Sequence, residues 1–216
     1  MEEQNKNARY LVIDLELTWL NPYLHWVIEV GAMVMNDNLD ILDEWRVVLC
    51  PPEEVQIDPS SLEYNGFTLD QISAWMAYEE FCNHFDLFLA THFPDPQKPI
   101  IIGQYVVADI SFLMSVFHRA SRDDLVMRLG NDIIDTKSIA NQVNMIARYK
   151  HMWLPFRSTS LSKAGGLAQT LNIGTYRSHT AMGDIRATRI VLKKLLNIWA
   201  DEVLVDEPMK DKEEQE

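Results

Sequence analysis

The chain has 216 residues, of which 47% are hydrophobic and 24% are charged. With 8 glycines, 9 prolines and 2 cysteines, it is neither collagen-like, nor low in complexity, nor a disulfide scaffold, and we expect one globular domain with a sizeable core. The net charge of −13 argues against non-specific nucleic-acid binding by the chain as a whole. Neither a membrane-length apolar run nor an apolar targeting segment is found. We therefore expect a cytoplasmic protein without a membrane partner.

Charge is distributed unevenly along the sequence. Residues 201–216 hold eight acids and two bases, whereas residues 137–200 hold ten bases and one acid, Asp184. The first 136 residues carry a net charge of −16. Residues 137–200 are therefore a candidate face for an anionic substrate, although solvated helix faces would produce the same pattern.

Apolar runs and alternation predict three strands in the first part of the chain, followed by a helix with apolar residues at helical spacing. Short links between the three strands favour an antiparallel meander. The second part alternates strands and helices, which predicts further parallel strands and an α/β mixed sheet flanked by helices. The expected strands are 10–17, 26–35, 41–49, 100–107 and 131–135, and the expected helices are 71–92, 110–120, 136–149, 161–171 and 181–199.

Three units follow from this organisation. Residues 1–8 are an N-terminal extension, residues 9–200 form the folded domain, and residues 201–216 are an acidic tail that we expect to be disordered. The tail could be a partner-binding arm or a solubilising end.

Two carboxylates lie two residues apart at the end of the first strand. Because side chains two apart point to the same side of a strand, Asp14 and Glu16 share one face. Two acids so close repel each other unless a positive group joins them. The alternative is that both simply point to water at the strand end.

Two further carboxylates lie where the next elements begin. Asp109 ends the predicted strand 100–107, at the carboxyl edge where open α/β sheets place ligands, or it caps the following helix. Asp184 lies in the first turn of the last helix, where an anion is favourable in any case.

Together these four acids provide the hard oxygen ligands that Mg²⁺ or Mn²⁺ prefers. Two such ions about 3.5–4 Å apart can activate a water and stabilise the leaving oxygen of a phosphodiester. The reaction also needs a group that takes the water's proton, and imidazole titrates near the working pH. We therefore assign the general-base role to His179, five residues before Asp184.

With these residues in place, the chain resembles the DEDDh superfamily of 3′-to-5′ exonucleases, also called DnaQ-like, which contains proofreading subunits, RNase T and oligoribonuclease. DLELTWL at 14–20 resembles the first family motif, GQYVVAD at 103–109 the second, and HTAMGD at 179–184 matches the third. The order and spacing of the three motifs make the resemblance specific. It covers about residues 9–199.

The resemblance implies a ribonuclease-H-like fold and a site that binds two divalent metal ions. It implies metal ligands Asp14, Glu16, Asp109 and Asp184, with His179 as the general base and Glu16 also among the catalytic residues. It further implies that Leu17 and Thr18 lie along the terminal nucleotide, although core packing and strand-end hydrogen bonding would explain them equally well. A homodimer is a common arrangement in the family.

The sequence departs from the family pattern in its substrate-facing positions. Trp19 replaces the usual glycine and offers a stacking surface or narrows the pocket, while Gln104, Tyr105 and Ala108 replace the usual polar and aromatic groups of the second motif.

We therefore expect a metal-dependent exonuclease that releases nucleoside monophosphates from the 3′ end of single-stranded RNA or DNA, with short RNA slightly favoured. The alternative is a non-catalytic nucleic-acid-binding or scaffold protein that retains the fold.

Overall fold

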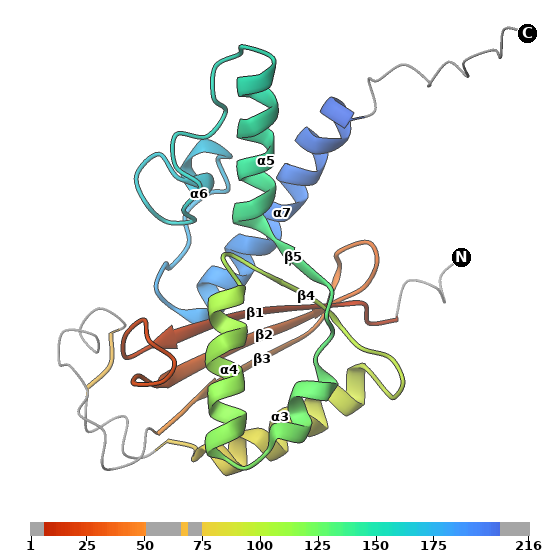
Figure 1. Ribbon diagram of the computed structural model, residues 1–216, viewed down its shortest axis with the longest axis vertical. Helices are drawn as coiled ribbons and strands as arrows, with labels where there is room; N and C mark the ends of the chain where they lie inside the picture. The colour runs from red at the N-terminus through yellow and green to blue at the C-terminus, as the bar shows by residue number, and fades with distance from the viewer. Residues whose placement is uncertain (1–6, 51–65, 69–74, 204–216) are drawn as a thin grey trace, which may run out of the picture.

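The first strand lies at the centre of a five-stranded mixed sheet (Figure 1). In this computed structural model, which describes residues 7–50, 66–68 and 75–203, the strand order is β3-β2-β1-β4-β5. The first three strands form an antiparallel meander, and β4 and β5 run parallel to β1. The predicted mixed sheet is confirmed. The strands are β1 (Tyr10–Leu17), β2 (Val27–Met35), β3 (Ile41–Val48), β4 (Ile100–Gly103) and β5 (Ile133–Asp135).

Helices cover both faces of the sheet, and the alternation of β1 decides what each face meets. Leu11, Ile13 and Leu15 pack into the large core with α3 (Tyr78–His92) and α4 (Val107–Arg119). Val12 packs on the opposite side with Ile185 of α7 (Ala181–Val203). Asp14 and Glu16 follow Val12 in the two-residue period, so they belong to the face that α7 covers.

A glycine in β2 lets α7 approach the sheet closely. A Cβ atom on Gly31 would lie 2.8 Å from the backbone carbon of Ala181, the first residue of α7, so any larger residue would push the helix away. Although α7 has 23 residues, neither it nor any other described helix is long and apolar enough to cross a bilayer.

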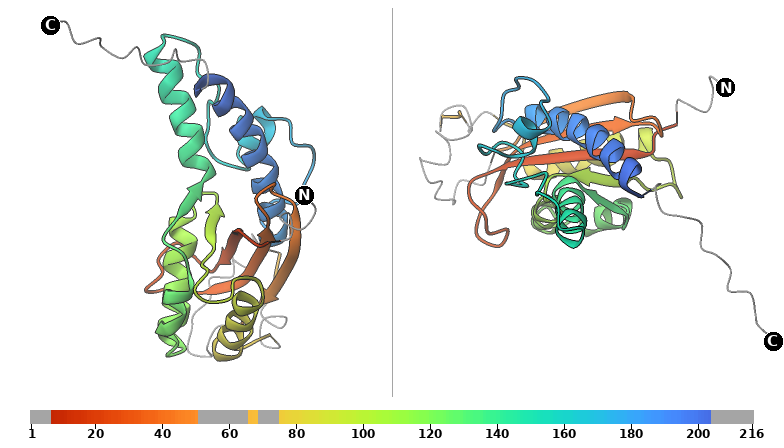
Figure 2. Two further views of the ribbon diagram at one scale, coloured as in Figure 1. Left: turned by 90° about the vertical axis from the view of Figure 1, so that its right-hand side faces the viewer. Right: turned by 90° about the horizontal axis from the view of Figure 1, so that it is seen from above.

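A smaller lobe stands beyond the edge of the sheet, where α5 (Thr136–Tyr149) runs beside α7 and carries the loop that contains α6 (Leu167–Thr170) (Figures 1 and 2). Phe156, Leu161 and Leu167 form its apolar core with residues of α5 and α7. The side chain of Asn144 fixes the loop to α5, because it donates to the carbonyl of Phe156 at 2.8 Å and accepts from its N–H at 3.0 Å.

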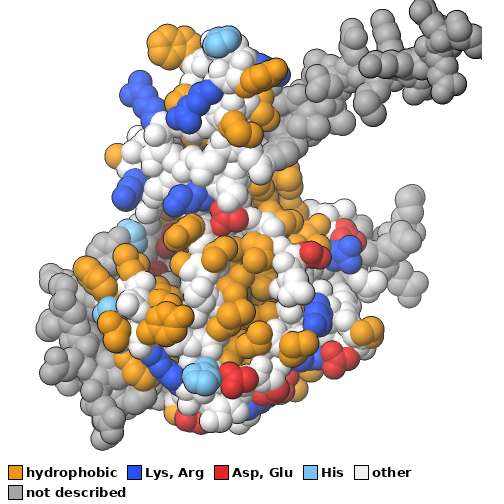
Figure 3. All heavy atoms as spheres, in the orientation of Figure 1, with side chains coloured by type: hydrophobic (Ala, Val, Ile, Leu, Met, Phe, Trp, Pro, Cys, Tyr) orange, Lys and Arg blue, Asp and Glu red, His pale blue; other side chains and the backbone are white. Residues whose placement is uncertain are grey.

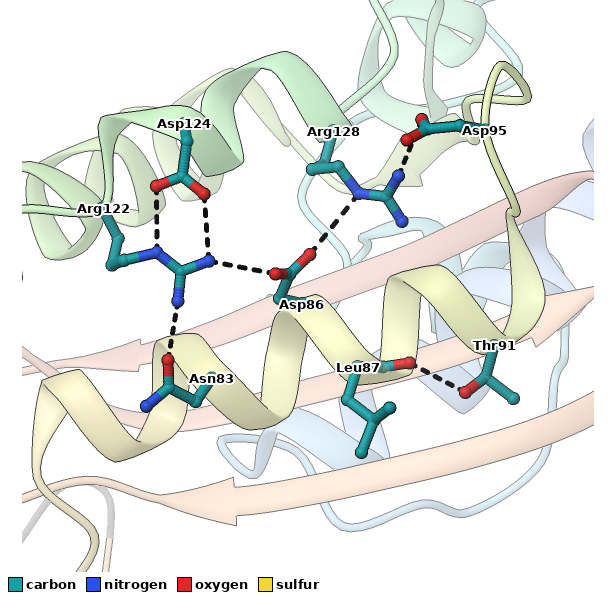
Figure 4. Close-up of polar contacts among 8 residues, drawn as sticks. All are labelled: Asn83, Asp86, Leu87, Thr91, Asp95, Arg122, Asp124 and Arg128. Atoms are coloured by element: carbon teal, nitrogen blue, oxygen red, sulfur yellow. Dashed lines mark hydrogen bonds and ion pairs between the residues drawn. The ribbon is translucent and has the colours of Figure 1, made fainter.

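The helix α3 is tied to the 3₁₀ helix η2 (Asp123–Arg128) by a group of ion pairs at the opposite end of the molecule from this lobe (Figures 1 and 4). Asp86 on α3 lies between two arginines, 3.0 Å from Arg122 and 3.5 Å from Arg128. Arg122 also pairs with Asp124, and Arg128 with Asp95.

Several predicted boundaries hold, and three need correction. The helix predicted at 136–149 has the same bounds as α5, and the last helix begins at Ala181 as expected but continues to Val203, three residues into the expected tail. The helix predicted at 71–92 begins only at Tyr78, because Met76 pairs instead with the end of β3 through Cys50 N–H and Val48 C=O. Residues 71–74 lie outside the described part of the chain.

The other two corrections both involve glycines. The strand predicted at 100–107 ends at Gly103, where the chain turns into α4 two residues earlier than Asp109. The helix predicted at 161–171 shortens to α6, because Gly165 takes a φ of +71° and a Cβ on Gly166 would lie 2.4 Å from the carbonyl oxygen of Ser160. Apolar spacing predicted a longer strand and a longer helix than these turns allow.

Candidate metal centre and nucleic-acid cleft

Three of the four predicted carboxylates converge on the face of the sheet that α7 covers. Each of Asp14, Glu16 and Asp184 offers a ligand atom, and these atoms all lie within 4.8 Å of one another. The strand alternation of β1 supplies the first two, and the first turn of α7 supplies the third. Hard oxygen donors grouped in this way could hold a divalent cation.

The fourth carboxylate, Asp109, is not among the three whose ligand atoms lie within 4.8 Å of one another, although its charge raises the pKa of Asp14 and Glu16. It lies in the first turn of α4 rather than at a strand end, and it does not cap that helix, whose N-cap residue is Val106. Its Oδ1 accepts a hydrogen bond of 3.1 Å from the N–H of Leu15. Because β4 pairs with β1 only as far as Val12, Asp109 serves the backbone of β1 beyond the end of β4.

Burial and mutual repulsion disfavour the ionised form of the carboxylates in and beside the cluster. Burial raises the pKa of Glu16 to about 8, and the charges of Asp184, Glu29 and Asp109 add to this effect. Burial likewise raises the pKa of Asp109 to about 8 and that of Asp184 to about 6. For Asp14, burial and then the neighbouring carboxylates, Asp109 first, raise the pKa well above its usual range. A bound cation would relieve this repulsion.

The hydrogen bonding of Asp184 supports cation binding at the cluster. Its Oδ2 accepts the backbone N–H of His179 at 3.0 Å, while its Oδ1 is buried and has no hydrogen-bond partner among the described residues. A buried carboxylate oxygen without a donor is costly. His179 adopts a φ of 59° and lines the same cleft, so the predicted base is beside the cluster.

Glu29 supports the cluster from the neighbouring strand. It is opposite Glu16 in the β1–β2 register and is fully buried. Its carboxylate accepts the N–H of Ala181 at 3.2 Å and pairs with Arg46 of β3. Glu29 therefore fixes the start of α7, and with it Asp184, against the sheet.

Two residues of the cluster, Asp14 and Asp184, line an open cleft of about 600 Å³. The residues that sequence reasoning did not assign to the site come from α5 and from the loop before α6, and only the fold brings them to the acids. Lys137 lies 4.3 Å above the ring of Tyr105, and Gln104 holds the loop through a 2.7 Å bond to the Thr159 carbonyl. The cleft is lined by Asp14, Leu20, Gln104, Tyr105, Lys137, residues 158–163, His179 and Asp184.

The three predicted substrate contacts differ in accessibility. Thr18 is buried, and its Oγ1 accepts the N–H of Trp26 at 2.9 Å, which is the strand-end role given above as the alternative. Leu17 is half-buried against the core. Trp19 is 55% exposed and available for stacking. Its neighbour Leu20, for which the sequence predicted no role, lines the cleft.

Comparison with known proteins agrees with the motifs and the carboxylate cluster. The sequence model of the RNase T family, described as "Exonuclease", matches residues 11–192. The chain belongs to the RNase T exonuclease family. The resemblance to the DnaQ-like superfamily is thereby confirmed, and the domain is that of a nuclease.

The curated relatives that this chain matches include PolC-type DNA polymerases III. The chain is 27% identical over 193 residues to the PolC-type DNA polymerase III of Thermotoga petrophila and 24% identical over 164 residues to that of Pediococcus pentosaceus. These alignments cover 89% and 76% of this chain but only 12% and 10% of the relatives.

Solved structures share the fold at lower identity. Escherichia coli Exonuclease I in complex with a dT13 oligonucleotide has a TM-score of 0.70 and 17% identity, covering 92% of this chain and 42% of that one. Exonuclease I from Methylocaldum szegediense has a TM-score of 0.69 and 16% identity, covering 90% and 41%. The ribonuclease-H-like fold expected from the motifs is confirmed.

Proposed function

We propose that this domain is a divalent-metal-dependent exonuclease that removes nucleoside monophosphates from the 3′ end of single-stranded DNA. One observation carries the proposal: Asp14, Glu16 and Asp184 bring ligand atoms within 4.8 Å of one another, and Asp14 and Asp184 line a cleft together with Lys137 and Lys163. The acids suit cations, and the lysines suit the phosphates of a strand entering the cleft.

Each site residue then has a distinct task. Asp14, Glu16, Asp109 and Asp184 would hold two divalent ions, Mg²⁺ or Mn²⁺. When bound, such ions supply the activation of a water and the stabilisation of the leaving 3′ oxygen. His179, on the cleft wall beside Asp184, takes the proton from the attacking water.

The 3′ terminal nucleotide would lie against the end of β1. Leu17 and Trp19 would offer apolar and aromatic surface to its base. Thr18 is buried, and its hydroxyl holds the backbone of Trp26 beside this surface rather than facing the nucleotide. A pocket of this kind accepts a chain end, which gives exonuclease rather than endonuclease action.

DNA is favoured over RNA by the relatives. The sequence alone slightly favoured short RNA, but the matching curated proteins are DNA polymerases and the similar structures include Exonuclease I bound to deoxyoligonucleotides.

The test is a time course on 5′-labelled single-stranded DNA and RNA of one sequence, with Mg²⁺, Mn²⁺ or EDTA, for the wild type and Asp184→Ala. We expect a ladder that shortens from the 3′ end, faster on DNA, and that disappears with EDTA or in the variant. Asp123→Ala, an exposed acid on η2, is the control and should behave as wild type.

Two results would count against the proposal. Loss of label from the 5′ end, or cleavage inside the strand, would contradict the direction and the end specificity. Oligonucleotide binding without cleavage under any metal would favour the non-catalytic binding protein instead.

A further inference from the structure

An exposed aromatic and basic surface lies at the far end of α5, away from the carboxylates. The side chains of Tyr149 and Trp153 are 85% and 97% exposed, and Met152 between them is 57% exposed. Arg148 and Lys150 are exposed beside them. We call residues 148–153 the α5 tip. Large aromatic residues that remain open to solvent on a basic background are typical of surfaces that stack single-stranded bases.

The chain around the tip carries only positive charge. Residues 136–183 contain six lysines and arginines and no aspartate or glutamate, in a protein whose net charge is −13. The space-filling view shows Lys and Arg side chains interleaved with hydrophobic ones over the lobe that contains α5 (Figure 3). Such a stretch is complementary to a polyanion.

The tip is continuous with the cleft along two routes. Lys137 at the start of α5 lines the cleft, and the tip begins about 16 Å farther along the same helix, at a rise of about 1.5 Å per residue. The loop that follows the tip returns to the cleft at residues 158–163. At about 3.4 Å per nucleotide for a stacked strand, this distance corresponds to about five nucleotides.

The tip is also held in place. The two hydrogen bonds between Asn144 and Phe156 fix the descending loop to α5, and the bond from Gln104 to the Thr159 carbonyl fixes its lower end at the cleft. A surface held in this way loses little conformational freedom on binding.

We propose that the α5 tip binds the single strand about five nucleotides upstream of its 3′ end, with Tyr149 and Trp153 stacking on bases and Arg148 and Lys150 contacting phosphates. The proposal rests on the proposed function, because it takes the 3′ end to lie at the carboxylates. It extends that function by predicting that substrates long enough to reach the tip bind more tightly than shorter ones.

The kinetic test compares 5′-labelled oligothymidylates of three and fifteen nucleotides. For Tyr149→Ala/Trp153→Ala we expect KM on the fifteen-mer to rise at least about fivefold, with kcat and the KM on the three-mer unchanged. Leu87→Ala/Met127→Ala, which removes two exposed apolar side chains elsewhere, should change neither KM. An equal rise in KM on both lengths, or no rise on the fifteen-mer, would overturn the proposal.

A binding test separates this proposal from the catalytic one. With the fifteen-mer in EDTA, binding is followed by fluorescence anisotropy against salt, so that no cleavage is required. Arg148→Gln/Lys150→Gln should reduce the slope of log K against log salt by about 1.4, whereas the exposed pair Arg9→Gln/Lys98→Gln should not. An unchanged slope overturns the phosphate contacts.

Cleavage by the wild-type protein tests the proposed function independently. Failure to shorten either oligonucleotide refutes that function, while the anisotropy measurement still tests binding at the α5 tip.

Sedimentation velocity tests whether the α5 tip is instead a contact between protein copies. If Tyr149→Ala/Trp153→Ala dissociates a dimer and leaves fifteen-mer binding intact, the tip is a contact between protein copies and the proposal is wrong.

Discussion

The buried carboxyls of Glu16 and Asp109 should make the stability of the metal-free protein depend on pH. Burial raises the pKa of each to about 8, whereas the carboxyls of an unfolded chain titrate near 4. Between these values the folded, metal-free protein binds more protons than the unfolded chain, so its stability falls as the pH rises from about 4 to 8. We expect the melting temperature in EDTA to decrease over this range, as followed by circular dichroism.

Replacing one acid isolates this effect from the rest of the protein. Glu16→Gln removes a titrating group, so the melting temperature of the metal-free variant should depend less steeply on pH and exceed that of the wild type near pH 8. Equal slopes for the two proteins would show that the cluster does not control the pH dependence.

His179 gives a prediction for catalysis. His179→Asn removes the imidazole, and asparagine tolerates the observed φ of 59° well. We expect kcat to fall about 10²- to 10⁴-fold, the usual contribution of a general base, while Mg²⁺ binding is retained. A variant with normal kcat would exclude His179 as the base.

At this scale, the sequence predicts what is local. The two-residue spacing of Asp14 and Glu16 on a strand predicted a shared face, and the helical context of Asp184 predicted its place in a first turn. The bond between Asp109 and Leu15 joins residues 94 positions apart, and no periodic pattern reveals such a partner.

The contact between β2 and α7 leads to a prediction about elements. In Gly31→Ala the new Cβ would lie 2.8 Å from the backbone of Ala181, so the start of α7 must shift, at a cost of about 1–3 kcal/mol. Because Asp184 moves with the helix, activity should fall by more than the loss of stability explains. Val116→Ala, in the core on the other face, should lose stability and retain activity.

The ion pairs between α3 and η2 should stabilise the protein without affecting its site (Figure 4). Asp86→Ala removes the carboxylate shared by Arg122 and Arg128, and we expect a loss of about 0.5–1 kcal/mol, since these groups are partly exposed. Urea unfolding measures the loss, and Asp123→Ala, whose partner is an exposed histidine, should cost less. Reduced nuclease activity in Asp86→Ala would contradict a purely structural role.

Element boundaries were predictable where a local signal marks them. Asp135 caps α5, because its Oδ1 accepts the N–H of Ser138 at 2.7 Å, and the helix begins at the predicted residue, Thr136. Apolar spacing failed between residues 161 and 166, because Leu161 packs into the core of the smaller lobe from a turn rather than from a helix.

For the whole molecule, cation binding should appear as thermal stabilisation. A ligand that binds only the folded state stabilises it by about 2.7 kcal/mol at one hundred times its Kd, which for a chain of this size is a rise of about 5–10 °C in melting temperature. We expect this rise in melting temperature with Mg²⁺ or Mn²⁺ at pH 8. NaCl of equal ionic strength, without divalent cations, should raise the melting temperature only slightly. Asp14→Asn should abolish most of it.

The mixed sheet was predictable from the apolar patterns and the family from the motifs, whereas the order of the strands in the sheet and the cleft were not. Lys137 and residues 158–163 reach the acids only because α5 stands beside α7 and the following loop folds back. The cytoplasmic location, the homodimer and the division at residues 8 and 200 stay predictions. Residues 1–6 and 204–216 lie outside the described part of the chain.

The four predicted carboxylates come from β1, from α4 and from the beginning of α7, so they span the chain from residue 14 to residue 184. A chain emerging from the ribosome holds three of the four acids once residue 109 has been made and lacks the last until α7 begins to appear. Because Asp184, among the described acids, is also the one with an unpaired buried oxygen, the nascent domain cannot complete its cation site early. The order of elements thus delays nuclease activity until the domain is nearly finished.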